Sequence, residues 1–149
     1  MNVNAEQALS DMFGRLFSEI NQVEEKALIT EEFQDISYKD MHILEAIGPD
    51  IPRTMSYVAG QMNITMGTLT IAINNLVKKG YVNRTRSNQD KRVVYVTLTK
   101  RGEQAYLRHQ KVHQKMAEAL VKDTTEEDQL VLLRALERLR QYFDQIRTS

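Results

Sequence analysis

Apolar residues recur at every third or fourth position from Ala8 to Val23, with polar residues between them. This period is typical of an amphipathic helix. A second helix is predicted to begin at Ser37, a suitable N-cap with Asp40 at the capping-box position, and to stop at Gly48. The chain is therefore predicted to open with two helices joined by a polar connection.

Two shorter helices are predicted next, after a loop at residues 49–53. Thr54 opens the first of them, and residues 63–65 form the turn into a longer helix that ends at Gly80. Glycine suits that position because it readily adopts the left-handed conformation that often terminates a helix. Two short helices around a tight turn are typical of a helix-turn-helix motif.

Residues 81–86 and 93–98 are rich in β-branched and aromatic side chains, and the polar residues 87–91 separate them. The pattern predicts a β-hairpin. Because a two-stranded hairpin is not stable by itself in water, we expect it to pack on the preceding helices. We therefore predict a mainly α chain with a small β-hairpin wing (α+β), which is a winged helix-turn-helix.

Two long helices are predicted to complete the chain. The first has Thr99 as its N-cap and extends to about Lys122, and the second ends at Arg147. Both carry apolar seams with spacings of three and four residues, which favour packing against a partner helix. The seams are Tyr106, His109, His113, Met116 and Leu120 in the first helix, and Leu132, Leu136, Leu139, Phe143 and Ile146 in the second.

These seams and the first helix present more apolar surface than a winged domain at residues 37–99 can cover. Burial across a two-fold axis is the simplest outcome. We therefore predict a homodimer in which residues 1–36 and 100–149 form a helical dimerisation region.

The net charge is zero, but the charges are segregated along the chain. Residues 51–101 hold nine Lys and Arg against the single acid Asp90, a net charge of +8, whereas residues 1–50 hold three bases and eleven acids, a net charge of −8. A basic segment inside a neutral protein is typical of a module that binds a polyanion. Residues 37–99 are therefore predicted to be a DNA-binding domain.

The sequence contains no cysteine, which excludes disulfides, thiolate metal sites and cysteine nucleophiles and fits a cytoplasmic protein. We see no secretory signal and no apolar run long enough for a membrane span, so no membrane partner is expected. No phosphate-cradling glycine loop and no Ser-His-Asp or Cys-His arrangement is evident. We therefore do not expect an enzyme.

The helix that ends before Gly80 divides into two faces. Leu69, Ile73 and Leu76 share the predicted core face, and the opposite face carries Ile71 and Asn74 but no arginine. A solvated face with a stray isoleucine is one interpretation. The other is a recognition helix, whose threonines and asparagine hydrogen-bond to DNA and whose isoleucine packs on thymine methyl groups.

The hairpin supplies the positive charge that the helix lacks, and it can reach a neighbouring minor groove. The alternative is a solvated hairpin with an incidental ion pair. The predicted DNA-contacting residues are Arg53, Thr65, Gly67, Thr68, Thr70, Ile71, Asn74, Lys78, Arg84, Arg86, Lys91 and Arg92, with Asp90 orienting Arg92.

The order of elements and the motifs "LVKKGYV", "DKR" (residues 90–92) and "LTKRG" resemble the MarR family of winged-helix repressors over essentially the whole chain. The segments "ISYKDMHILEAIG", "ITMGTLTIAINNLVKKGYV" and "DKRVVYVTLTKRG" are similar to the FabT-type repressors of fatty-acid synthesis genes. This resemblance implies a homodimer on a palindromic A·T-rich operator, with long-chain acyl–acyl carrier protein as corepressor. It implies no required cofactor.

The three histidines support an alternative. His109 and His113 are four residues apart on one helix face, a spacing that can chelate a metal, although such pairs are more often buried hydrogen-bonding residues. Glu24, His42, His109 and His113 resemble the ligands of the zinc-sensing branch of the same family. Thr30 stands where that branch has a cysteine of a second site. A zinc-responsive repressor and a ligand-independent architectural DNA binder thus remain as alternatives.

Overall fold

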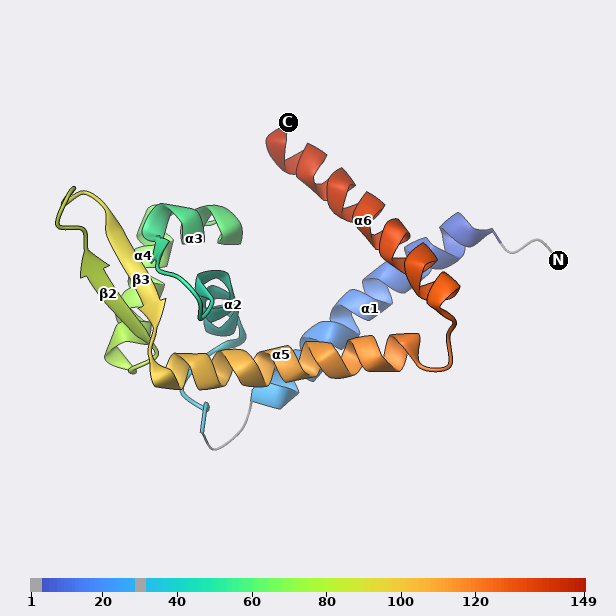
Figure 1. Ribbon diagram of the computed structural model, residues 1–149, viewed down its shortest axis with the longest axis horizontal. Helices are drawn as coiled ribbons and strands as arrows, with labels where there is room; N and C mark the ends of the chain where they lie inside the picture. The colour runs from blue at the N-terminus through green and yellow to red at the C-terminus, as the bar shows by residue number, and fades with distance from the viewer. Residues whose placement is uncertain (1–3, 29–31) are drawn as a thin grey trace. The chain divides into compact units, whose positions relative to one another are not determined.

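The computed structural model describes residues 4–28 and 32–149, so Thr30 lies outside the described residues. The mainly helical fold class with a small sheet is confirmed (Figure 1). The elements in chain order are α1 (Ala5–Leu28), α2 (Tyr38–Ile47), β1 (Arg53–Thr54), α3 (Met55–Met62), α4 (Met66–Lys78), β2 (Val82–Arg86), β3 (Val94–Leu98), α5 (Lys100–Val121) and α6 (Glu126–Thr148).

The chain divides into two compact units, residues 1–112 and residues 113–149. The first contains the helix-turn-helix, the sheet and the first part of α5. The second contains the end of α5 and α6. No helix in the described part of the chain is both long enough and apolar enough to cross a membrane.

The sheet has three antiparallel strands in the order β1-β3-β2, one more than the predicted hairpin. The expectation of a loop at residues 49–53 was wrong at its last residue, because Arg53 pairs with Val96 and Thr54 with Tyr95. A strand of two residues is too short to produce a hydrophobic period, so the sequence pattern could not indicate it. Through this pairing β1 joins the start of α3 to the central strand of the wing.

The core of the first unit lies between the helix-turn-helix and the sheet. The predicted inward face of α4 is confirmed, since Leu69, Ile73 and Leu76 are fully buried. Val96 from β3 and Tyr81, which precedes β2, are also fully buried. The hairpin therefore packs on the helices, as expected for two strands that cannot stand alone.

Side-chain caps fix the helix starts in this unit. The hydroxyl of Ser37 accepts a hydrogen bond from the backbone N of Asp40, whose carboxylate accepts from the backbone N of Ser37, so the predicted capping box is present. Thr54 caps α3 and Thr65 caps α4, because their hydroxyls accept hydrogen bonds from the backbone N of Tyr57 and of Thr68. Gly80, with φ of 85°, ends α4 in the left-handed conformation, as predicted.

Helix α1 is longer than the predicted span of residues 8–23, because the polar residues at its ends contain no helix breaker. Its apolar side chains are exposed in the isolated chain: Leu9, Met12, Phe13, Leu16, Phe17, Ile20 and Val23. Helix α6 likewise exposes Leu130, Val131, Leu133, Leu136, Tyr142, Phe143 and Ile146. Each helix thus has an apolar surface that the described chain leaves uncovered.

Candidate functional site

The outward face of α4 carries an exposed isoleucine. The side chain of Ile71 is 69% exposed, whereas Leu69 and Ile73, two residues before and after it, are fully buried. Gly67 has no atom within 4 Å of the position that a Cβ would occupy, so the surface at the start of the helix is open. Single exposed apolar side chains are normal on protein surfaces, so Ile71 is accessible to a ligand but does not by itself indicate a binding face.

A groove of about 570 Å³ separates this face from the wing. Thr70 and Asn74 of α4 line one side, and Arg84, Arg86 and Arg92 of the hairpin line the other. Its remaining lining comes from β1, the start of α3, the first residue of α4 and the start of the last hairpin strand: Thr54, Met55, Ser56, Met66, Val93 and Val94. The sequence analysis did not predict these residues as part of the site. For Thr54, Met55 and Ser56 the missing information was the β1 pairing, which joins the start of α3 to the wing.

Hydrogen bonds within the protein hold the polar side chains of the groove. The hydroxyl of Thr70 donates to the backbone oxygen of Met66 at 2.8 Å. Nη1 of Arg84 donates to Oδ1 of Asn74, which joins β2 to α4. Three of the predicted contact residues, Thr70, Asn74 and Arg84, are therefore preorganised by partners from the same domain.

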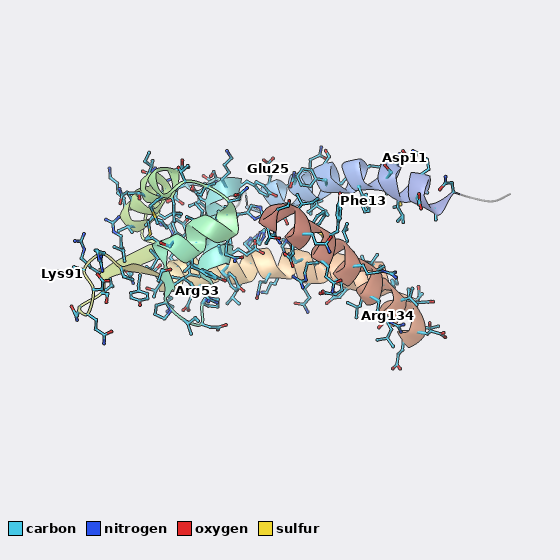
Figure 2. All side chains as sticks on the ribbon, turned by 90° about the horizontal axis from the view of Figure 1, so that it is seen from above. Asp11, Phe13, Glu25, Arg53, Lys91 and Arg134 are labelled. Carbon is cyan, nitrogen blue, oxygen red and sulfur yellow. The ribbon has the colours of Figure 1, made fainter. Side chains whose placement is uncertain are left out.

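The expected pairing of Asp90 and Arg92 is present at the hairpin. Nε and Nη2 of Arg92 each donate to the Asp90 carboxylate at 3.1 Å, and the backbone N of Arg92 donates at 3.0 Å. These side-chain and backbone hydrogen bonds lower the pKa of Asp90 below its ordinary value. The carboxylate therefore stays ionised and holds the guanidinium, while Lys91 lies at the tip of the wing (Figure 2).

The other predicted contact residues lie outside this groove, on β1, at the two ends of α4 and in the turn before it. The guanidinium carbon of Arg53 lies 4.6 Å from the centre of the Tyr57 ring, and such stacking restricts a long side chain. Lys78 is in the last turn of α4 and is exposed. Thr65 and Thr68 hydrogen-bond to each other through their hydroxyls at 2.8 Å. The structure thus brings the predicted residues of α4, the wing and β1 into one domain.

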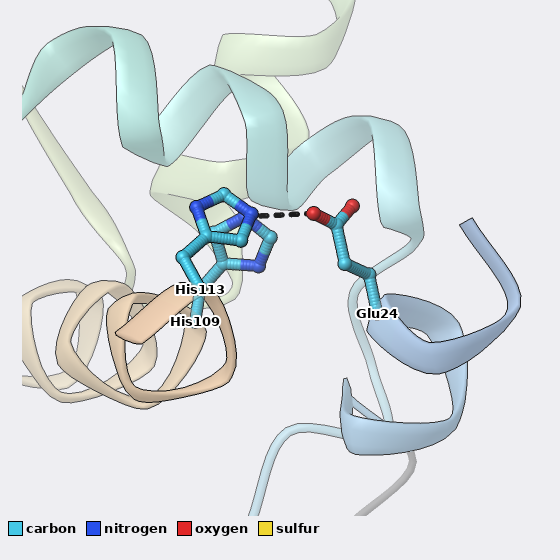
Figure 3. Close-up of side chains that lie close together, drawn as sticks. All are labelled: Glu24, His109 and His113. Carbon is cyan, nitrogen blue, oxygen red and sulfur yellow. Dashed lines mark ion pairs between the residues drawn. The ribbon is translucent and has the colours of Figure 1, made fainter. Parts of the chain in front are cut away.

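A second cluster lies where α1, α2 and α5 meet within residues 1–112. Glu24 and His109 are 3% and 2% exposed, and Oε1 of Glu24 lies 3.9 Å from Nε2 of His109 (Figure 3). His42 approaches both, with 3.7 Å between its Nε2 and Oε2 of Glu24 and 5.7 Å between the two imidazole centres.

The sequence analysis missed one member of this cluster, Glu45. Its Oε2 lies 3.3 Å from Nδ1 of His42 and 3.3 Å from Nε2 of His109. Glu45 follows His42 by three positions on α2, so the helical period could have indicated it. His113 lies one turn beyond His109 on α5, at the start of the second unit, and its role as a ligand stays a prediction.

The acidic groups of this cluster shift the pKa values of its neighbours. The hydrogen bond to Glu45 raises the pKa of His42 above its ordinary value, with part of the increase offset by burial. Burial, together with a hydrogen bond to Glu24, raises the pKa of Tyr38 to about 12. A carboxylate-rich environment that stabilises a cationic imidazole is also suited to a divalent cation.

Residues 26–108, more than half of the chain, match the family described as transcriptional regulator SarA/Rot. The chain belongs to this family. It is a DNA-binding transcriptional regulator with a winged helix-turn-helix, and its relatives are regulators rather than enzymes, which confirms the expectation that it is not an enzyme.

The solved structure of Streptococcus pneumoniae FabT in complex with DNA is similar to this chain over 95% of its length and 99% of FabT, with 36% identity and a TM-score of 0.85. A MarR family protein from Bacillus stearothermophilus shares the fold, with a TM-score of 0.77, 19% identity and coverage of 97% of this chain and 99% of that one. The transcriptional regulator PchR of Bacillus subtilis is 24% identical over 146 residues, which cover 89% of this chain and 86% of PchR. The expected resemblance to MarR-family regulators is thus confirmed.

Proposed function

We propose that this regulator represses fatty-acid synthesis genes, binds an A·T-rich palindromic operator as a homodimer and takes long-chain acyl–acyl carrier protein as corepressor. The observation that carries the proposal is the similarity to FabT, at 36% identity over 95% of the chain. The effector and the target genes follow from the resemblance to FabT-type repressors, and the DNA-binding geometry is supported by the residues of the groove.

The proposed complex places α4 in a major groove and the hairpin against the adjacent minor groove. Ile71 then packs on thymine methyl groups, which favours A·T pairs. Arg92, held by Asp90, is suited to a narrow minor groove, where the negative potential is enhanced. Lys78 and Arg86 neutralise phosphates and provide affinity that falls with salt.

The homodimer is supported by the uncovered apolar faces of α1 and α6. Phe17 and Leu133 are 70% and 63% exposed, a large exposure for such side chains in a single-chain protein. Burial against a second copy removes that surface from water and places two recognition helices on two half-sites.

The proposal is tested by a mobility-shift titration with DNA from a fatty-acid synthesis promoter. We expect palmitoyl- or oleoyl-acyl carrier protein to increase operator affinity, and acyl carrier protein without an acyl chain to have no effect. If neither acylated form changes the affinity, the acyl corepressor is rejected. If the effect is absent and the footprint does not depend on any ligand, an architectural DNA binder is favoured instead.

We further propose zinc as an alternative effector, because a specific cluster favours it. His42, Glu45 and His109 each offer one ligand atom within 4.8 Å of the others. Tetrahedral zinc with nitrogen and oxygen ligands at 2.0–2.1 Å separates its ligand atoms by roughly 3.3 Å. The two contacts of Glu45 with the imidazoles have this separation, so Nδ1 of His42, Oε2 of Glu45 and Nε2 of His109 are spaced as three ligands of one tetrahedral ion.

Zinc is tested by competition with a chromophoric chelator. We expect the wild type to take zinc from the chelator, His109→Ala to lose this ability, and Glu25→Ala, which removes an exposed carboxylate next to Glu24, to retain it. Equal zinc affinity in the wild type and His109→Ala would exclude the cluster as the site. Zinc binding alone does not make the protein a zinc-responsive regulator. That role also requires a change in operator affinity when zinc is added.

A further inference from the structure

Two hydrogen bonds inside the protein determine which polar atoms α4 can offer to a ligand. The hydroxyl of Thr70 donates to the backbone oxygen of Met66 at 2.8 Å, and Nη1 of Arg84 donates to Oδ1 of Asn74. The direction of both bonds is fixed by chemistry, since a carbonyl oxygen only accepts and a guanidinium only donates. The orientation of the Asn74 amide is therefore set by Arg84.

These bonds leave opposite hydrogen-bonding capacities at the two positions. The proton of the Thr70 hydroxyl is committed to Met66, so the oxygen of Thr70 remains as an acceptor. The oxygen of Asn74 faces Arg84, and its amino group makes no hydrogen bond within the described residues. The two side chains are four residues apart on one helix face, about 6 Å along the axis, with the exposed Ile71 between them.

We propose that Arg84 is a positioning residue for base recognition, which makes α4 present an acceptor at Thr70, an apolar contact at Ile71 and a donor at Asn74. The inference deepens the proposed DNA complex and is independent of the acyl or zinc effector. It assigns Arg84 a role that differs from that of Arg86, two residues along the same strand. Both arginines line the groove, but in the described structure only Arg84 donates to Asn74.

The edges of the bases in the major groove then determine the preference at each position. A donor at Asn74 is matched by thymine O4, by guanine O6 or by a purine N7, whereas cytosine presents only its amino group there. An asparagine with both ends of its amide available makes a bidentate contact with adenine, but Arg84 engages the end that would accept. Asn74 is therefore expected to discriminate against cytosine. Thr70 is expected to select an amino group, from adenine or cytosine.

The experiment uses the full-length protein and duplexes selected from a randomised library. The operator position at which the wild type prefers one base pair and Asn74→Ala does not is the position that Asn74 contacts. Binding is then measured for duplexes with thymine or cytosine at that position, using the wild type, Arg84→Met, Arg84→Lys and Arg86→Met. Arg86→Met is the matched control, because it removes the same charge from the same strand without touching Asn74.

We expect the wild type to bind the cytosine duplex on the order of tenfold more weakly than the thymine duplex. Arg84→Met should reduce this ratio to roughly threefold or less, because the freed amide can turn its oxygen toward the cytosine amino group. Arg84→Lys keeps a donor and should keep the ratio, and Arg86→Met should lower affinity for both duplexes equally.

An unchanged ratio in Arg84→Met overturns the positioning role, as does an equal change of the ratio in Arg84→Met and Arg86→Met. Folding of each variant is checked by its thermal unfolding midpoint, and Arg84→Ala replaces Arg84→Met, with the same expectation, if the latter does not fold. If the wild type selects no sequence from the library, the proposed DNA-binding role itself is contradicted. This result differs from one that overturns only the positioning role of Arg84.

Discussion

The guanidinium of Arg101 lies on the ring of Tyr81, with 4.4 Å between the guanidinium carbon and the ring centre. Both side chains also meet Asp35, whose Oδ1 accepts from the Tyr81 hydroxyl at 2.6 Å and from Nη2 of Arg101 at 3.2 Å. The Tyr81 ring is fully buried, so the start of α5, the start of the wing and the segment before α2 are joined at one point.

This junction predicts an alkaline loss of stability. Burial raises the pKa of Tyr81 above its ordinary value, and the hydrogen bond to Asp35 adds to the effect. A raised pKa in the folded state stabilises the protein fully below about pH 10, and this contribution is lost as the pH rises toward the folded-state value. Tyr81→Phe should lower the free energy of unfolding by about 1 kcal/mol at pH 7 and flatten its decline above pH 10. Urea unfolding from pH 7 to pH 11.5 measures this, and parallel declines in both proteins would contradict it.

Two glycines predict opposite effects of an added methyl group. A Cβ at Gly102 would lie 2.2 Å from the backbone oxygen of Tyr81, so Gly102→Ala should destabilise the protein by about 2–3 kcal/mol. A Cβ at Gly67 meets nothing within 4 Å, and Gly67→Ala should stabilise the helix by about 0.5–1 kcal/mol. The same methyl group projects from the proposed DNA face, so Gly67→Ala should weaken operator binding while it raises the unfolding midpoint. If both the unfolding midpoint and the operator affinity of Gly67→Ala increased, Gly67 would not be part of the DNA-binding face.

Ile71→Ala should reduce sequence preference more than salt-dependent affinity. The side chain is exposed, so stability should change by less than about 0.5 kcal/mol. Replacing operator thymines by deoxyuridine removes their methyl groups and should weaken wild-type binding about fourfold for each contacted methyl, but should have little effect on Ile71→Ala. Binding isotherms with both duplexes test this, and an equal loss in the two proteins would show that Ile71 does not contact a methyl group.

Arg92→Ala should lower operator affinity and reduce the slope of log affinity against log salt by about one. Asp90→Asn keeps the size of the neighbouring side chain but weakens its hold on Arg92, so it should have a smaller effect of the same kind. Filter binding at several salt concentrations measures both slopes. An unchanged affinity and slope in Arg92→Ala would show that the wing assignment is wrong.

Phe17→Glu should produce a monomer. The substitution places a charge on the apolar face of α1, where Phe17 is 70% exposed in the isolated chain, and a buried charge opposes association. Ser18→Glu introduces the same charge on the opposite side of the helix and should leave the assembly unchanged. Sedimentation velocity distinguishes the two, and a dimer of unchanged affinity in Phe17→Glu would place the interface elsewhere.

The sequence predicted the elements that carry a period or a cap. Leu69, Ile73 and Leu76 define the buried face of α4 by their spacing, and Ser37 and Gly80 mark helix ends by their backbone chemistry. The two strands of the hairpin were recognisable from their β-branched residues, and their packing on the helices followed from their inability to stand alone. Local physics determines each of these features.

Features that depend on tertiary contact were not predictable in the same way. Strand β1 exists because Arg53 and Thr54 pair with β3. The sequence of two residues contains no signal for a pairing partner more than forty positions away. The bond between Arg84 and Asn74 joins side chains that the sequence placed separately on the wing and the helix. Glu45 lies one turn from His42 on α2, but its approach to His109 of α5 arises only from tertiary packing.

The short pairing of β1 with β3 limits how this regulator can respond to an effector. Thr54 pairs with Tyr95 of the wing and also caps α3, so the wing cannot tilt without moving the helix-turn-helix. In each protomer, the wing and the helix-turn-helix therefore move together as one rigid body. In the proposed dimer, a corepressor has to alter the separation of two such bodies, and its effect should depend steeply on the number of base pairs between the operator half-sites.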